Sequence, residues 1–136
     1  MRRSVGVLLL AAGALTAISA VGCSRADGLG DLKYFRGATL VGTTTSSGEA
    51  FGFPDAQWEQ VELRSEAPYE QVRDFYARLD VRGWTSTFEN ESAKATGRVY
   101  WRYLADNPRR VFYVIVVEER QRSGDVSIVL RRGLAR

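Results

Sequence analysis

The 136-residue sequence predicts a small α+β domain in two layers, in which one helix packs on an antiparallel sheet of about five strands. Two observations lead to this prediction. One segment has apolar residues at helical spacing, and the segments around it alternate apolar and polar residues as strands do. The last three of these alternating segments are joined by short turns, which indicates an antiparallel meander.

The helix is expected over about residues 68–82. Four apolar residues at positions i, i+3, i+4 and i+7 form one stripe along it: Val72, Phe75, Tyr76 and Leu79. After the helix, Gly83 can adopt the left-handed conformation and Trp84 can fold back on Leu79. This combination is typical of a Schellman ending.

Strands are expected in six segments: residues 38–44, 57–64, 84–89, 98–104, 110–120 and 126–132. Residues 45–56 are rich in glycine, serine and threonine, and they are expected to form a loop. Residues 89–97 are polar and are expected to form a turn. Within the segment 98–104, the side chains expected to face the helix are Val99, Trp101 and Tyr103, with Tyr100 and Arg102 on the other face.

The segment from Val111 to Val117 is apolar at every position, so both faces of this strand are apolar. A sheet covered by one helix needs only one apolar face. The second face is therefore covered by aromatic residues of the segment 34–56, by another subunit, or by a ligand or envelope partner. The intramolecular candidates are Tyr34, Phe35, Phe51 and Phe53. Our hypothesis is that the open face of the sheet carries binding through Tyr100, Phe112, Val114 and Val116.

The first 22 residues have the layout of an export signal, which is to be set aside before the fold is considered. Arg2 and Arg3 are followed by an uncharged, mostly apolar run. The sequence Ala20-Val21-Gly22-Cys23 then resembles the lipobox of bacterial lipoproteins. This resemblance implies that Cys23 receives a diacylglyceryl group and becomes the acylated N-terminus after cleavage.

Two other interpretations of this segment stay open. An uncleaved signal anchor is one, because the apolar run can just span a bilayer of about 30 Å. Cleavage after Ala20 by an ordinary signal peptidase, which leaves Cys23 a free thiol, is the other. As a lipoprotein, the chain would be exported and anchored to the cell membrane, or to the outer membrane in a cell that has one, since Ser24 follows the cysteine.

Residues 23–33 are expected to form a flexible tether, and residues 34–136 a single domain. The arrangement of Phe75-Tyr76, Leu79 and Gly83-Trp84 resembles a helix-to-strand junction in small exported bacterial proteins of unassigned function. That resemblance supports the α+β fold and implies no activity.

Composition narrows the possible functions. The chain has no histidine and one cysteine, which excludes histidine-dependent triads, His/Cys metal clusters and intramolecular disulfides. Loss of Arg2 and Arg3 with the signal lowers the formal net charge from +3 to +1, so nucleic acid is not an expected partner. We expect no cofactor, no metal and no catalysis. The expected function is binding or scaffolding in the envelope; the alternatives are a small-ligand sensor and a carboxylate-dependent hydrolase.

Overall fold

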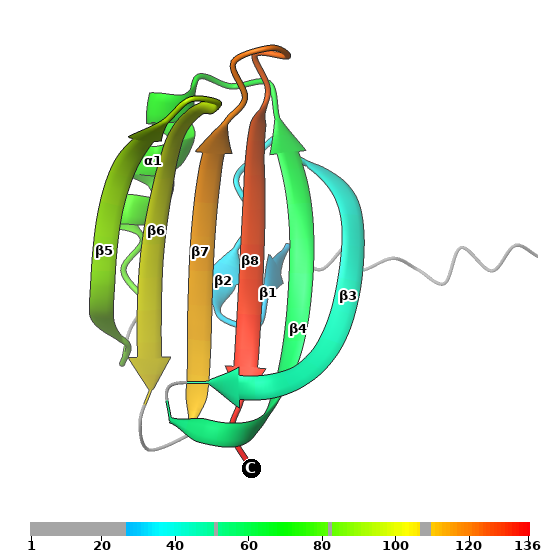
Figure 1. The fold of residues 1–136 in the computed structure, drawn as a ribbon, viewed down its shortest axis with the longest axis vertical. Coiled ribbons are helices and arrows are strands. Elements are labelled where there is room, and N and C mark those ends of the chain that lie inside the picture. The colour runs from blue at the N-terminus through cyan, green and yellow to red at the C-terminus, as the bar shows by residue number, and fades with distance from the viewer. Residues whose placement is uncertain (1–26, 51, 82, 107–109) are drawn as a thin grey trace, which may run out of the picture.

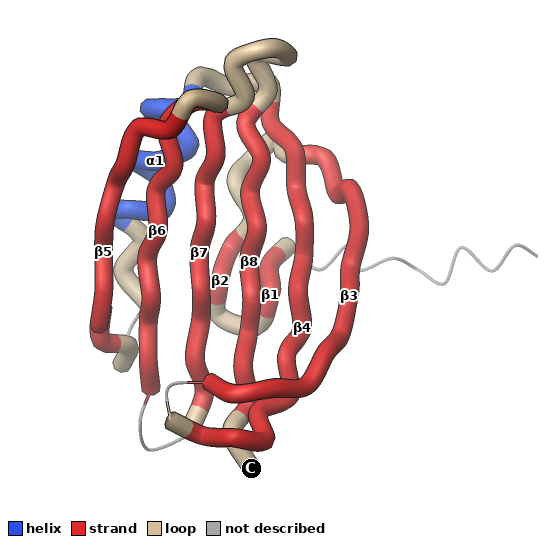
Figure 2. Tube along the Cα trace, in the orientation of Figure 1, coloured by secondary structure: helices blue, strands red, loops and turns tan. Residues whose placement is uncertain are grey.

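The computed structural model describes residues 27–50, 52–81, 83–106 and 110–136. In these residues the chain forms a six-stranded antiparallel sheet, one helix and a small two-stranded hairpin (Figures 1 and 2). The helix and the small hairpin lie on the same side of the large sheet. In chain order the elements are β1 (Gly28–Leu29), β2 (Leu32–Lys33), β3 (Thr39–Ala50), β4 (Phe53–Ser65), α1 (Tyr69–Arg78), β5 (Thr85–Lys94), β6 (Gly97–Asp106), β7 (Val111–Glu119) and β8 (Val126–Leu134).

The large sheet has the strand order β3-β4-β8-β7-β6-β5. Strands β6, β7 and β8 are consecutive and antiparallel, so the predicted meander is confirmed. The chain enters the sheet at one edge through the β3–β4 hairpin. It then passes through α1 to β5 at the opposite edge and returns through the meander until β8 pairs with β4.

The predicted fold class is wrong, because the protein is mostly β and not one helix on a five-stranded sheet. Residues 45–56 are expected to form a loop, but residues 45–50 belong to β3 and residues 53–56 to β4, and the two strands pair as a long hairpin. β3 is an edge strand rich in serine and threonine, and its residues are largely exposed. Such a strand lacks the apolar alternation that identifies strands in a sequence. Residues 89–97, expected to form a turn, largely belong to β5, another exposed edge strand.

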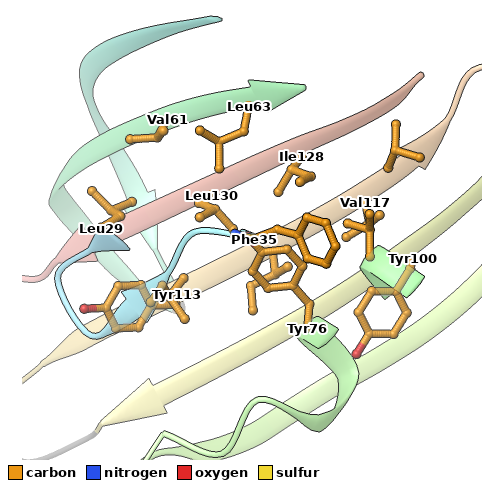
Figure 3. Close-up of a cluster of buried hydrophobic side chains, with 14 of the residues drawn as sticks. Leu29, Phe35, Val61, Leu63, Tyr76, Tyr100, Tyr113, Val117, Ile128 and Leu130 are labelled. Atoms are coloured by element: carbon orange, nitrogen blue, oxygen red, sulfur yellow. The ribbon is translucent and has the colours of Figure 1, made fainter. Parts of the chain in front are cut away.

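The predicted apolar stripe of the helix packs on the centre of the sheet. Val72 and Tyr76 are fully buried, and they belong to the same cluster as Tyr113, Ile115 and Val117 of β7. Figure 3 shows part of this cluster, with side chains from both layers pointing toward one another. The Tyr76 hydroxyl also accepts a hydrogen bond of 3.0 Å from the buried backbone N–H of Phe35.

The part of the expected tether that the structure describes is the β1–β2 hairpin, which is packed into the core. Leu29 and Leu32 are buried in the core cluster, and their hairpin lies beside α1 behind the central strands of the sheet. Gly30 makes the turn with a φ of +57°, and a Cβ there would clash with the Tyr113 hydroxyl oxygen. The domain therefore begins at β1, before residue 34. Phe35 packs on this same side, edge-to-face against Phe75.

The helix ends at Arg78, one turn earlier than predicted. Gly83 has the predicted left-handed conformation, with a φ of +86°, but it lies beyond the end of the helix and does not form a Schellman ending. Leu79 is already extended, with φ −61° and ψ 107°. Arg102 of β6 reaches across from the sheet, and its Nη1 donates hydrogen bonds to the carbonyls of Tyr76 (2.6 Å) and Leu79 (2.8 Å). These bonds satisfy carbonyls that the end of a helix leaves free. Trp84 packs on Tyr113 instead, with ring centroids 4.6 Å apart.

Candidate functional site

The predicted alternation along β7 is confirmed. Tyr113, Ile115 and Val117 point to the side of α1, where they are buried. Val114 and Val116 point to the other side of the sheet, which neither α1 nor the β1–β2 hairpin covers, and there they are half-buried. We call this side the open face. It faces the viewer in Figure 1, where α1, β1 and β2 lie behind the sheet.

A hollow of about 520 Å³ lies on the open face. It is lined by Glu49, Trp58, Trp101, Tyr103, Val114, Val116, Val129 and Arg131. These residues come from five of the six strands, and their side chains are predominantly aromatic or aliphatic. The hollow is therefore a feature of the assembled sheet, and no short segment of the sequence encodes it.

The strand register gives the shape of the hollow. Trp101, Val116 and Val129 are paired in one row across β6, β7 and β8, and Tyr103, Val114 and Arg131 form the next row. The three valines make a low floor in the centre of the sheet. The strand of Trp58 (β4) and that of Trp101 (β6) are three strand spacings or about 14 Å apart, and the two residues are also two rows apart along the strands. The two indoles thus stand on opposite sides of the valine floor.

Gly133 of β8 positions the Trp58 side chain. The two residues are paired across the strands, and a Cβ at position 133 would lie 2.9 Å from Cζ3 of the indole. Real Cβ atoms do not approach a ring so closely, so the indole lies against the backbone of β8 because residue 133 has no side chain.

The tip of the β3–β4 hairpin closes one end of the hollow. Figure 1 shows the end of β3 crossing in front of the neighbouring strands. Phe53 packs on Phe112 with ring centroids 5.5 Å apart, and Ala56 joins the same small cluster. Arg110 lies 4.5 Å above the Phe53 ring. Phe112 is consequently buried under this end, whereas Val114 and Val116 line the part that is open.

Of the four residues predicted to form the binding face, three lie on the open face and Tyr100 does not. Tyr100 is buried on the side of α1, where its hydroxyl donates a 2.7 Å hydrogen bond to Glu89. Burial is the main reason that the pKa of Tyr100 lies well above its usual value, and the hydrogen bond to the Glu89 carboxylate raises this pKa further. The expected assignment of the segment 98–104 is therefore reversed: Tyr100 and Arg102 face the helix.

Trp101 and Tyr103 consequently belong to the open face, and the prediction missed them as site residues. Trp58, Val129 and Arg131 were also missed. A partial signal for Trp58 was available, because β4 alternates its side chains and a tryptophan fell on the polar side of the strand. The sequence contains no signal that pairs Trp58 with residues more than forty positions away.

The remaining charged cluster joins α1 to the sheet. Arg98 of β6 donates hydrogen bonds to Glu70 of the helix (2.6 Å) and to Glu119 of β7 (2.8 Å). These bonds hold the pKa values of both carboxyls below their usual range. Arg73 and the Tyr69 hydroxyl similarly donate to Glu91. Since these carboxylates are already bonded to arginine or tyrosine, the cluster serves to dock the helix.

No helix among the described residues has the length and apolar character needed to span a membrane. Nor do those residues gather three or more metal-ligating side chains into one group. Cys23, the predicted lipid attachment site, lies outside the described residues. Comparison of the chain with family models, with curated proteins and with solved structures found no match.

Proposed function

We propose that the chain is an exported lipoprotein, anchored through Cys23, that binds a small apolar molecule in the hollow of the open face. The observation that carries the binding part is the valine floor between Trp58 and Trp101, which neither α1 nor the β1–β2 hairpin covers. Small-molecule sites are concave, mostly apolar and about 300–1,000 Å³ in volume, with a few polar groups that orient the ligand. The hollow, at about 520 Å³, has this character.

The short link between Cys23 and the domain supports the same proposal. β1 begins at Gly28, five residues after Cys23, and an extended link of this length spans at most about 18 Å. β1 lies on the side of α1, opposite the open face. A lipid on Cys23 would thus hold the covered side near the membrane and leave the hollow accessible from the water.

Two other functions have less support. A hydrolase that uses two carboxylates needs both within about 5–10 Å across a cleft. The described lining of the hollow offers one carboxylate, Glu49. A scaffold for another protein would be better served by a flat apolar face than by a hollow with an arginine in it.

The anchor is tested by growing cells with a radioactive fatty acid. The wild-type protein is expected to take up label, and Cys23→Ala is expected to take up none. Ser24→Ala is the matched control, because it changes the neighbouring residue and keeps the thiol. Equal labelling of wild type and Cys23→Ala would refute the anchor.

Binding is tested with the full chain held in a lipid nanodisc and labelled with fluorotryptophan, which gives one fluorine NMR signal for each of the three tryptophans. Trp58 and Trp101 line the hollow, whereas Trp84 packs on Tyr113 on the other side of the sheet. The probe is hydrocinnamyl alcohol, a small neutral molecule with a phenyl ring. It is expected to shift the signals of Trp58 and Trp101 and to leave Trp84 unchanged. If all three signals moved together, or none moved, the proposed binding would be wrong.

A further inference from the structure

Arg131 of β8 lies within the lining of the hollow, beside the valine floor. Its Nε donates a 2.6 Å hydrogen bond to Oε1 of Gln60, its partner in the strand register on β4. This bond fixes the direction of the guanidinium. Its two terminal nitrogens form no hydrogen bond or ion pair with the other described residues. The structure therefore presents an oriented, solvent-exposed cation at the edge of a mostly apolar hollow.

The nearby carboxylates leave this cation available. Glu62, one row further along β4, lies 4.0 Å from Arg120. Glu49 lines the hollow from the hairpin tip, and the described structure contains no ion pair between Glu49 and Arg131. An anionic group in the hollow is thus attracted to Arg131 and repelled by Glu49. Arg110, at the same end of the hollow, lies over the Phe53 ring and is not part of the lining.

The order of the rows then sets the direction of a ligand. Starting from the hairpin tip, the first row contains Trp58, the second Arg131 and Val114, and the third Val129, Val116 and Trp101. A ligand whose anionic end lies at the second row finds aliphatic and indole surface on the side away from Glu49. Its apolar body therefore extends over the third row toward Trp101.

We infer that the ligand of the hollow is a small apolar carboxylate, held at its charged end by Arg131 and along its body by the valine floor and Trp101. This inference rests on the proposed function and names the class of ligand. The planar guanidinium offers parallel N–H groups that match the two oxygens of a carboxylate.

The experiment compares three probes with the same phenylpropyl skeleton: hydrocinnamate, the neutral hydrocinnamyl alcohol and the cationic hydrocinnamyl amine. Dissociation constants are measured from the fluorine signals of Trp58 and Trp101 in the full chain, with Trp84 as the internal reference. Hydrocinnamate is expected to bind about tenfold more tightly than the alcohol, and the amine more weakly than both.

Arg131→Gln is expected to remove the preference for hydrocinnamate while the alcohol still binds. Lys94→Gln is the matched control, because Lys94 lies 5.7 Å from the Trp101 ring centroid but does not line the hollow. Equal binding of hydrocinnamate and the alcohol would overturn the inference and leave the proposed function standing. Loss of the preference in Lys94→Gln, and not in Arg131→Gln, would also overturn it. Absence of binding by all three probes would refute both.

An apolar anion can be free in solution or part of a bilayer, and a second arm separates the two sources. Nanodiscs of phosphatidylglycerol are compared with nanodiscs of phosphatidylcholine, without added probe. If the ligand is a free molecule, the signals of Trp58 and Trp101 are expected to be identical in the two kinds of nanodisc. A shift of these signals in phosphatidylglycerol alone would show that an anionic lipid occupies the hollow, and would overturn the inference for a free carboxylate.

Discussion

Replacement of Arg102 by methionine tests the interaction that ends the helix. Arg102→Met keeps a long apolar stem and removes both hydrogen bonds, to the carbonyls of Tyr76 and Leu79. A hydrogen bond from a charged group contributes about 1.5–3 kcal/mol, and two bonds give roughly 3 kcal/mol at the lower value. Because Arg102 is half-buried, water replaces part of this loss. The free energy of unfolding is therefore expected to fall by about 2 kcal/mol.

The assay is urea unfolding followed by circular dichroism, with the slope m compared between variants. An unchanged m with a lower midpoint shows that stability, and not compactness, has changed. Arg102→Lys keeps the charge but has a single ammonium group, so about half of the loss is expected to be recovered. Arg122→Met, at an exposed turn position, is the matched control and should lie within about 0.5 kcal/mol of wild type. A loss below about 0.5 kcal/mol in Arg102→Met would show that these bonds do not hold the end of the helix.

Two further predictions concern packing and pH. In Gly133→Val the new side chain must displace the Trp58 indole, since even a Cβ would lie 2.9 Å from it. Urea unfolding should show that the free energy of unfolding falls by about 1–3 kcal/mol. A double-mutant cycle with Trp58→Ala should show that the two substitutions are coupled. If the losses of stability in Gly133→Val and Trp58→Ala were additive, the close packing of Trp58 on Gly133 would be contradicted. Arg98 lowers the pKa of Glu70 and Glu119 from the ordinary 4.5, so the stability from these carboxylates is present above that pH and lost as pH falls through the folded-state pKa values. The urea midpoint should therefore drop between about pH 6 and about pH 3, and Arg98→Gln should drop less; an equal drop would refute the assignment.

The parts of the fold that sequence predicts are those with strong periodicity. The stripe of Val72 and Tyr76 identified the centre of α1, and the short turns between apolar segments identified the meander. These patterns are local, because each follows from burial of one face of one element. Both edge strands, β3 and β5, are longer than the sequence predicts, because they lack such a pattern. The exposed residues of β3 and β5 have no buried face to generate a pattern, and their partners in the sheet determine their length.

The β1–β2 hairpin was missed because its strands are only two residues long. Leu29 and Leu32 are separated by glycine and aspartate, which is also the composition of a flexible linker. Their burial depends on a gap in the covering layer beside α1, and Tyr113 supports it by accepting a 2.9 Å hydrogen bond from the backbone N–H of Asp31. A gap of this kind is a property of the assembled sheet and leaves no trace in the local sequence.

The composition of the site depends on which set of β6 side chains faces the helix, and the sequence does not determine this. Both sets of side chains on this strand carry aromatic and polar groups, so alternation alone separates the two faces without assigning them. Arg102 supplies a physical reason for the arrangement observed. On the side of α1 it reaches the carbonyls of Tyr76 and Leu79, which would otherwise lack partners. The reverse arrangement would leave the helix end without its donor. The contact that completes the helix thus also directs Trp101 and Tyr103 to the open face, where they form the wall of the proposed binding site.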